Sequence, residues 1–190
     1  MSDYRDELVV ARNAEGNRLH ADLAIVCPGY AQVCRRLTAE RSLTAAEQLL
    51  ADLAVVRAEV ARQRIKRLRE LDREIRQITV QLTKLVAASR TPLTGIVGVG
   101  PILAARILGE VGDVGRFPDA DHFAAAKGTA PIPVASGRTD RHRLNRGGNR
   151  RLNRAIHYVA LTQATWEPRA VAYLARSRLK ARPAVKPCGA

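Results

Sequence analysis

The sequence predicts a mainly α-helical protein, in which long helices of the coiled-coil type precede a small helical domain that contains a helix-hairpin-helix. Three observations predict this class. Apolar residues recur at three- and four-residue steps, glycine and proline are absent from residues 44–91, and only 96–99 and 132–135 have strand character. With 46% hydrophobic residues, the 190-residue chain can form a folded core.

Residues 1–43 are expected to form linker helices. The first should span 4–24, with its apolar positions interrupted around Gly16. Pro28-Gly29 predicts a turn, and a short helix should follow over about 31–39. The apolar positions of the first helix are Leu8, Val9, Ala11, Leu19 and Leu23.

Residues 44–90 are expected to form a long helix that pairs as a coiled coil. Thr44 and Glu47 have the spacing of a capping box, so the helix should start at Thr44 and run to about residue 89. Two alternatives are open: one helix packed on its own domain, or an antiparallel hairpin with a bend near 61–67. A narrow apolar seam with alternating three- and four-residue steps runs along the second half, at Leu68, Leu71, Ile75, Ile78, Leu82 and Leu85.

Residues 91–180 are expected to form the small helical domain. Gly95, Gly98 and Gly100 precede Pro101 and predict a tight turn that leads into a helix ending at Val111. This arrangement has the form of a helix-hairpin-helix, in which the backbone at Gly98 and Gly100 would bind a phosphate. A plain turn between two helices is the alternative.

The rest of this domain is expected to alternate turns and short helices. Residues 113–117 should form a turn, 119–127 a short helix and 128–137 an irregular loop, with Asp113 and Asp119 forming turns and caps. Asn149 should cap a last clear helix. Beyond Pro168 the chain should become loop-like, and residues 181–190 should form a basic tail.

The net charge of +14 is concentrated near the end of the chain. Residues 1–134 carry 19 basic and 16 acidic side chains, whereas residues 135–190 carry 13 basic and two acidic ones. Arginine matches phosphate oxygens with two parallel hydrogen bonds, so double-stranded DNA is the expected partner. The alternative is a solvated basic face that reflects composition. The densest run, which we predict to bind DNA, comprises Arg138, Arg141, Arg143, Arg146, Arg150, Arg151 and Arg154.

Ser136 is the candidate catalytic nucleophile. It precedes Gly137 and the arginine run, whose cations would stabilise charge on a phosphate that the hydroxyl attacks. His142, six residues on, is a candidate base or acid. A Ser-Gly pair in a loop is more often a plain turn, and the residues alone leave that alternative open.

No metal site, membrane segment or leader is predicted. The carboxylates near Asp113 are expected to cap turns rather than bind metal, and Cys27, Cys34 and Cys188 lack metal-ligand spacing. The chain starts with charged residues and has no apolar stretch of about 18 residues. We therefore expect no cofactor in this chain, no membrane partner, and a cytoplasmic protein associated with the nucleoid.

Three segments resemble the C-terminal, serine-bearing domain of the Piv-type insertion-sequence transposases, also called DEDD transposases or the IS-one-ten family. They are TGIVGVGPILAARILGEVGDVGRF from Thr94, FAAAKGTAPIPVASGR, and LNRGGNRRLNRAIHYVAL. The upstream DYRDELVVARNAEGNRLHADL is similar to the segment that joins that family's two catalytic domains. The resemblance covers about residues 3–178.

The resemblance implies a DNA recombinase. In that family an RNase-H-like domain with four acidic metal ligands precedes the serine-bearing domain, and the serine motif falls here on Ser136-Gly137. Ser136 would attack the phosphodiester and form a phosphoserine link. The helices over 44–90 would form coiled coils between subunits of a homo-oligomer. A noncoding guide RNA is a second implied partner, because some members use one.

Two departures from the family pattern bear on activity. The acidic domain should lie upstream of residue 1, so Mg²⁺ is expected only with that domain. The family's last helix, after Arg178, is replaced here by a proline-rich ending. We therefore expect a truncated recombinase that does not transpose alone. The alternatives are a non-enzymatic helix-hairpin-helix DNA-binding protein and a coiled-coil interaction protein with an incidental basic tail.

Overall fold

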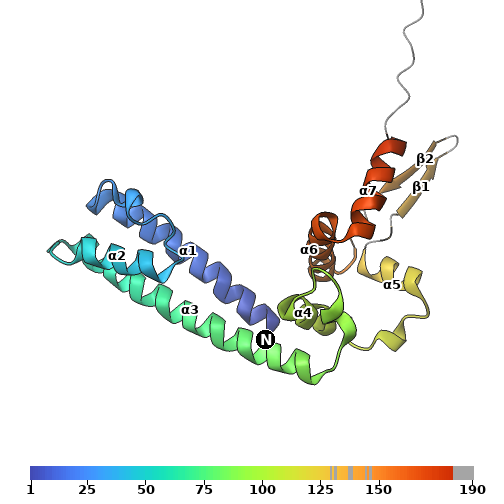
Figure 1. Cartoon of the computed structure of the whole chain (residues 1–190), viewed down its shortest axis with the longest axis horizontal. Helices are drawn as coiled ribbons and strands as arrows, with labels where there is room; N and C mark the ends of the chain where they lie inside the picture. The colour runs from blue at the N-terminus through green and yellow to red at the C-terminus, as the bar shows by residue number, and fades with distance from the viewer. Residues whose placement is uncertain (129, 131, 137–138, 144, 146, 182–190) are drawn as a thin grey trace, which may run out of the picture. The chain divides into compact units, whose positions relative to one another are not determined.

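The computed structural model describes residues 1–181 except 129, 131, 137–138, 144 and 146, and for residues 133–142 and 178–181 it describes only the backbone of those that remain. The chain divides into two compact units, Met1–Lys84 and Leu85–Ala190, here called the helical unit and the C-terminal unit. Helices dominate both units, which confirms that the protein is mainly α-helical (Figure 1).

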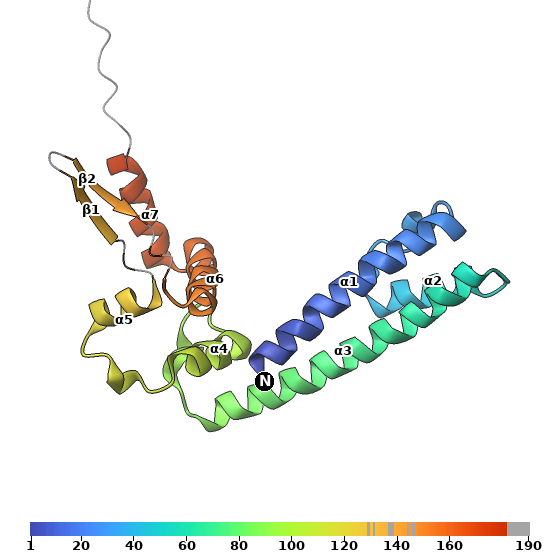
Figure 2. The ribbon, with the colours of Figure 1, turned by 180° about the vertical axis from the view of Figure 1, so that it is seen from behind.

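The helical unit consists of three α-helices and one 3₁₀ turn. Helices α1 (Ser2–Val26) and α2 (Glu40–Leu50) lie alongside α3 (Val56–Ala88), and Figure 2 shows the same arrangement from behind. Ion pairs place Arg12 near Asp72 and Asp22 near Arg57, so α1 runs antiparallel to α3. The 3₁₀ turn, Tyr30–Gln32, follows Gly29, whose φ of +88° suits glycine and confirms the turn predicted at Pro28-Gly29.

An apolar core holds these helices together. Burying one leucine side chain contributes roughly 2 kcal/mol, so this cluster is the main source of stability for the unit. Its largest fully buried members are Leu19, Leu23, Leu43, Leu50, Ile65 and Leu68, and they come from all three helices.

The predicted helix over 4–24 is confirmed as α1, which is continuous through Gly16 from Ser2 to Val26. Glycine in a helix costs about 1 kcal/mol relative to alanine. Contacts on both sides of Gly16 offset that cost. Arg12 pairs with Asp72 before Gly16, and Asp22 pairs with Arg57 and Arg64 after it, so α3 holds the two halves of α1 in line.

The uninterrupted helix expected over 44–89 is wrong, and the bend proposed near 61–67 is misplaced. The chain leaves the helix after Leu50 and re-enters it at Val56, while Thr44 lies inside α2 rather than at a helix start. Folding back lets the apolar face of α2 pack on α3. Arg62 Nη1 donates to the carbonyl oxygen of Leu50 at 2.5 Å, which stabilises the exposed end of α2 without glycine or proline.

The apolar seam of α3 packs largely inside its own chain. Leu68, Leu71 and Leu82 are buried in the helical unit, whereas Leu85, beyond its boundary, is 58% exposed. Packing on the chain's own helices, one of the alternatives, therefore accounts for these buried positions. A coiled coil between subunits stays a prediction.

The C-terminal unit has α4 (Pro101–Val111) and α6 (Arg150–Trp166) at its centre. Val99, Ala104, Ile107 and Val159 pack together there with Val86. The predicted helices over 102–111 and 119–127 and after Asn149 are confirmed, the second as α5 (Ala120–Lys127). Two short 3₁₀ turns, Pro92–Gly95 and Val114–Arg116, precede and follow α4.

Two expectations for the C-terminal unit are wrong. The irregular loop expected over 128–137 contains strand β1 (Ile132–Ser136), which pairs antiparallel with β2 (Thr139–Arg143). The loop expected beyond Pro168 is helix α7 (Pro168–Ala181). Proline at the first helical position suits a helix start, because its missing N–H has no partner there.

No helix in the described part of the chain combines the length and apolar character needed to cross a membrane.

Carboxylates in the helical unit neutralise many of its arginines. Arg64 donates to Glu15 at 2.6 Å and to Asp22 at 2.7 Å, and Arg69 pairs with Glu40 and Glu47. Burial, the largest single influence, raises the pKa of Glu15, but hydrogen bonds and charge from Arg64 and Arg18 together hold this pKa below its ordinary value of 4.5. Its ionised form therefore stabilises the folded unit.

We expect Glu15→Gln to destabilise the helical unit near neutral pH and to have little effect in acid. Because the folded pKa is lowered, the contribution of Glu15 is complete above pH 4.5 and disappears as the pH falls through the lowered value. Thermal unfolding of both proteins between pH 7 and 3 measures this. The gap in melting temperature should close below pH 4.5, whereas a constant gap would contradict the assignment. Glu7→Gln, at an exposed position of α1, is the control.

Candidate nucleic-acid interface

The glycine turn before α4 is packed against α6. Gly98 has a φ of +89°, and the amide of Val99 donates to Ile96 oxygen at 2.9 Å, which closes a turn that needs positive φ at its third residue. A Cβ on Gly98 would lie 2.9 Å from Thr162 Cβ. Internal packing therefore explains glycine at this position. The predicted phosphate contact of Gly98 stays a prediction.

Gly100 occupies the N-cap of α4. It is exposed, a Cβ there would meet open space, and Pro101 follows at the first helical position. No side chain caps this helix start. An uncapped helix N-terminus presents backbone N–H groups and partial positive charge, which is compatible with the predicted phosphate contact.

The backbones of Gly128 and Gly148 touch, and this contact, here called the glycine junction, joins α5 to the start of α6. A Cβ on Gly148 would lie 2.3 Å from both Cα and N of Gly128. Gly128 also has a φ of +75°, which favours glycine at the end of α5. Neither position has room for a side chain.

Two asparagines and one glutamate fasten this junction. Asn145 Nδ2 donates to Ala125 oxygen at 3.1 Å and ties the segment before α6 to α5. Asn149 Oδ1 accepts from the amides of Arg151 and Leu152, each at 3.0 Å, and confirms the predicted cap. Its Nδ2 donates to Glu110 Oε2 at 2.5 Å. The last turn of α4 therefore holds the N-terminus of α6.

Lys127 is a structural cation whose role the sequence pattern did not predict. It is only 4% exposed, its Nζ donates to Glu110 oxygen at 3.1 Å, and the Phe117 ring centre lies 5.2 Å from it. A backbone carbonyl and a neighbouring aromatic face satisfy the charge. The only sequence signal is a lysine in the last turn of a short helix before glycine, where the helix dipole favours a cation.

The backbone places Ser136 at the tip of the β-hairpin. Ser136 ends β1 and pairs with Thr139, the first residue of β2. His142 pairs with Pro133, three positions further along the ladder, which is roughly 10 Å of strand. This register does not set His142 opposite Ser136. Gly137 and Arg138 between the strands lie outside the described residues, as does Arg146.

In the predicted interface, the arginines whose side chains the structure describes are all exposed, but they have different contacts. Arg143 at the end of β2 and Arg150 at the start of α6 are both exposed. Arg151 Nη1 lies 3.7 Å from Glu110 Oε1, and Arg154 donates to the Tyr158 hydroxyl at 3.2 Å. Arg141 pairs with Val134 in the ladder, and only its backbone is described.

The ion pair between Arg151 and Glu110 weakens the case for a bound anion at the start of α6. Basic residues at a helix start oppose the helix dipole, which favoured a bound anion beside α6. Glu110 supplies part of the compensating negative charge from within the protein. Only the remaining exposed arginines therefore favour an external anion at the start of α6.

We expect Asn149→Ala to destabilise the C-terminal unit by about 1–2 kcal/mol, because it removes the cap of α6 and the bond to Glu110. Asn149→Ser keeps an acceptor for the cap and should cost less. Chemical denaturation followed by signals from the C-terminal unit measures both. Equal stability of the alanine variant and the parent would contradict this role of Asn149.

Comparison with known proteins indicates a class for the C-terminal unit. Residues 90–175 match the model of the family described as "Transposase IS116/IS110/IS902 family". This segment contains the glycine turn, the β-hairpin, the glycine junction and all of α6. The match supports a transposase role.

Two relatives come from insertion elements of Streptomyces. The "Insertion element IS110 uncharacterized 43.6 kDa protein" of Streptomyces coelicolor is 40% identical over 90 residues, which cover 46% of this chain and 22% of that protein. The "Insertion element IS116 uncharacterized 44.8 kDa protein" of Streptomyces clavuligerus is 33% identical over 104 residues, covering 54% and 25%. The chain thus spans about a quarter or less of the length of these relatives.

Among the described residues, no group of three or more His, Cys, Asp or Glu side chains is placed to hold a metal ion. Asp113 and Asp119 act as predicted. Asp113 Oδ1 accepts from the amide of Gly115 and Asp119 Oδ1 from that of His122, each at 2.8 Å. Both carboxylates therefore serve as local caps.

Proposed function

We propose that this chain carries the serine-bearing, DNA-binding part of a transposase, with Ser136 as the nucleophile. The observation that carries the proposal is the family match over residues 90–175, because it includes Ser136 and the arginine-rich segment together. The relatives are much longer than the matched segment, so the proposal assigns only the serine step and DNA binding to this chain.

The proposed step is a transesterification at phosphorus. Ser136 Oγ forms a bond to the phosphorus of a DNA phosphodiester, the bond from phosphorus to the leaving deoxyribose oxygen breaks, and the proton lost by the serine balances the proton gained by that oxygen. The product is a phosphoserine linkage that conserves the energy of the ester. Nearby arginines would stabilise the charge that develops on the non-bridging oxygens.

The placement of Ser136 supports this proposal. A nucleophile must reach a phosphate on the surface of a duplex, and Ser136 lies in the last pair of the ladder, at the tip end of the hairpin. The glycine junction fixes α5, which precedes the hairpin, against the start of α6, which follows it. Exposed Arg143 and Arg150 lie at the two ends of the short segment that joins β2 to α6.

The alternative is a non-enzymatic DNA-binding protein that uses the helix-hairpin-helix. The uncapped start of α4 at Gly100 favours it, because backbone N–H groups at such a position bind phosphate without chemistry. Both proposals predict DNA binding, and they differ only in the role of Ser136.

We expect duplex DNA binding to weaken steeply with salt, and the double variant Arg143→Gln/Arg150→Gln to bind more weakly. Each lost phosphate contact should lower the slope of log K against log salt by roughly 0.9, so the double variant should lose about two units of slope. Fluorescence anisotropy with one labelled duplex across a salt series measures this.

The control is Arg18→Gln/Arg67→Gln, which removes the same charge from the helical unit. Both arginines are exposed, and each forms an ion pair: Arg18 with Glu15 at 3.0 Å and Arg67 with Glu70 at 3.1 Å. The control slope should stay near that of the parent. Binding that does not respond to salt, or an equal loss in both double variants, would refute the proposed interface.

A further inference from the structure

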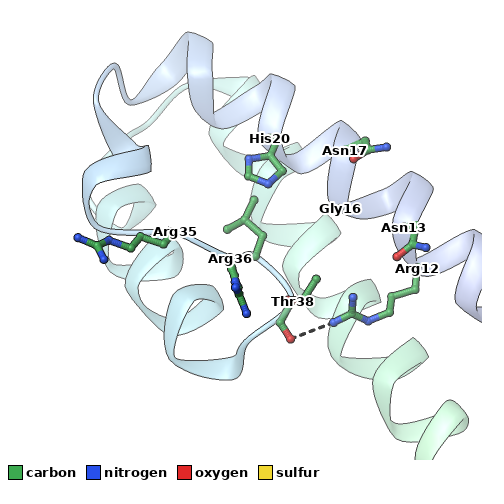
Figure 3. A pocket seen from close by; sticks show the side chains of 9 residues that line it. Arg12, Asn13, Gly16, Asn17, His20, Arg35, Arg36 and Thr38 are labelled. Carbon is green, nitrogen blue, oxygen red and sulfur yellow. Dashed lines mark hydrogen bonds between the residues drawn. The ribbon is translucent and has the colours of Figure 1, made fainter. Parts of the chain in front are cut away.

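The helical unit contains a pocket of about 570 Å³ between α1 and the segment that precedes α2 (Figure 3). Apart from Gly16 and Leu37, the residues that line it are basic or polar, and none of them is a carboxylate. The proposed serine chemistry does not involve this pocket. The lining residues that bear most directly on ligand binding are Arg12, Gly16, His20, Arg35, Arg36 and Thr38.

Arg12 is held in place at the rim of the pocket. Its Nη2 donates to the carbonyl oxygen of Thr38 at 3.0 Å, and two hydrogen bonds join its guanidinium to Asp72 on α3. The side chain is therefore preorganised and its remaining donors are fixed in direction. Preorganised donors lose little conformational entropy when a ligand binds.

Arg36 supplies charge that the protein does not neutralise. It is exposed, and within the described part of the chain no carboxylate pairs with it. Figure 3 shows Arg36 on the side of the pocket that carries Thr38, whereas the neighbouring Arg35 extends away from the other labelled side chains. Carboxylates of the helical unit pair with Arg12, Arg57 and Arg64, whereas the guanidinium of Arg36 is left to contact a ligand.

His20 lines the pocket, and a hydrogen bond to Tyr30 holds its ring in place. Its Nδ1 is hydrogen-bonded to the Tyr30 hydroxyl at 2.6 Å, and the two rings lie 5.7 Å apart. Tyr30 thus occupies one ring nitrogen, and Nε2 is the nitrogen left to contact a ligand.

Gly16 keeps the wall of the pocket free of side chain. It lies inside α1, where glycine costs about 1 kcal/mol relative to alanine, and a Cβ there would meet nothing within 4 Å. Packing and backbone geometry therefore do not require glycine. Its one structural consequence is an open wall beside Arg12 and Arg36.

We propose that this pocket binds a phosphate group, which Arg12 and Arg36 hold by charge-assisted hydrogen bonds, with His20 as a further polar contact. Arginine forks match the oxygens of a phosphate, and the volume accommodates a phosphate together with an attached sugar. The phosphate comes from a mononucleotide or from the backbone of a nucleic acid. The inference is independent of the proposed function, because the pocket lies in the helical unit and Ser136 in the C-terminal unit.

The test is a titration of the whole chain, labelled with ¹⁵N, with adenosine 5′-monophosphate and separately with a twelve-nucleotide single-stranded DNA. We expect saturable shifts of the Gly16 and Leu37 amides. Saturation with the mononucleotide identifies a nucleotide-type ligand, and saturation with the DNA alone identifies a backbone phosphate. No saturable shift with either probe overturns the proposal.

Three variants make the titration specific. Arg36→Gln should weaken binding at least tenfold, whereas Arg35→Gln, with the same charge loss on the neighbouring residue, should stay within twofold. Gly16→Leu should fill the pocket and abolish binding without lowering the melting temperature, because leucine is the better helix former. Equal weakening by the two arginine variants, or full binding by Gly16→Leu, overturns the proposal.

Discussion

Gly148→Ala should unfold the C-terminal unit. The new Cβ would lie 2.3 Å from two backbone atoms of Gly128 and 2.5 Å from the carbonyl carbon of Lys127. Backbone atoms cannot rotate away as a side chain does, so α5 and the start of α6 must separate. Overpacking typically costs 1–3 kcal/mol, and a clash with backbone belongs at or above the upper end, about 3 kcal/mol or more.

The adjacent glycine provides the matched control. A Cβ on Gly147 would lie 3.5 Å from Asn145 Oδ1, which is an ordinary contact, so Gly147→Ala should be tolerated. Thermal unfolding and hydrogen exchange of the α6 amides measure both variants. Loss of protection in α6 for Gly148→Ala alone is expected. A stable, protected Gly148→Ala protein would show that the glycine junction does not hold this unit together.

Local signals in the sequence predicted local structure well. Asp113, Asp119 and Asn149 were expected to accept backbone hydrogen bonds, and all three do. Such contacts join residues two or three positions apart, so a short stretch of sequence contains both partners. The helices that follow Pro101 and Asn149 were found for the same reason.

Contacts between distant residues were not predictable in the same way. The helix ends at Leu50 because α2 folds back on α3 and Arg62 caps it, although no glycine or proline marks the break. The burial of Lys127 depends on Glu110 and Phe117, and the close approach of Gly128 to Gly148 joins residues twenty positions apart. In each case packing overrides local propensity.

The numbers of acidic and basic residues in the sequence showed where the charge is concentrated, and the ion pairs in the structure explain it physically. The first 134 residues contain nearly as many acidic as basic side chains, and α1, α2 and α3 bring them together as pairs such as Arg64 with Glu15 and Asp22. The later segment has few carboxylates to pair with. Glu110 partly compensates Arg151, a contact that the sequence did not reveal.

Ser136→Ala should abolish covalent attachment to DNA while leaving DNA binding unchanged. Alanine removes the Oγ that the proposed step requires, and a methyl group at the end of β1 removes no charge from the interface. Loss of the nucleophile should reduce adduct formation to background, an all-or-none effect. Ser136→Cys, which restores a nucleophile, should recover part of the adduct.

Covalent trapping of DNA can show whether Ser136 attacks phosphorus. The whole chain is incubated with duplexes from the DNA that flanks its reading frame, with a bridging phosphorothiolate at either the 3′ or the 5′ oxygen position. The thiolate leaves readily, so the serine step alone can be observed. A denaturation-resistant protein–DNA adduct with the parent and none with Ser136→Ala is the predicted result. Salt-sensitive binding without any adduct on either linkage would contradict the account and favour the non-enzymatic DNA-binding protein.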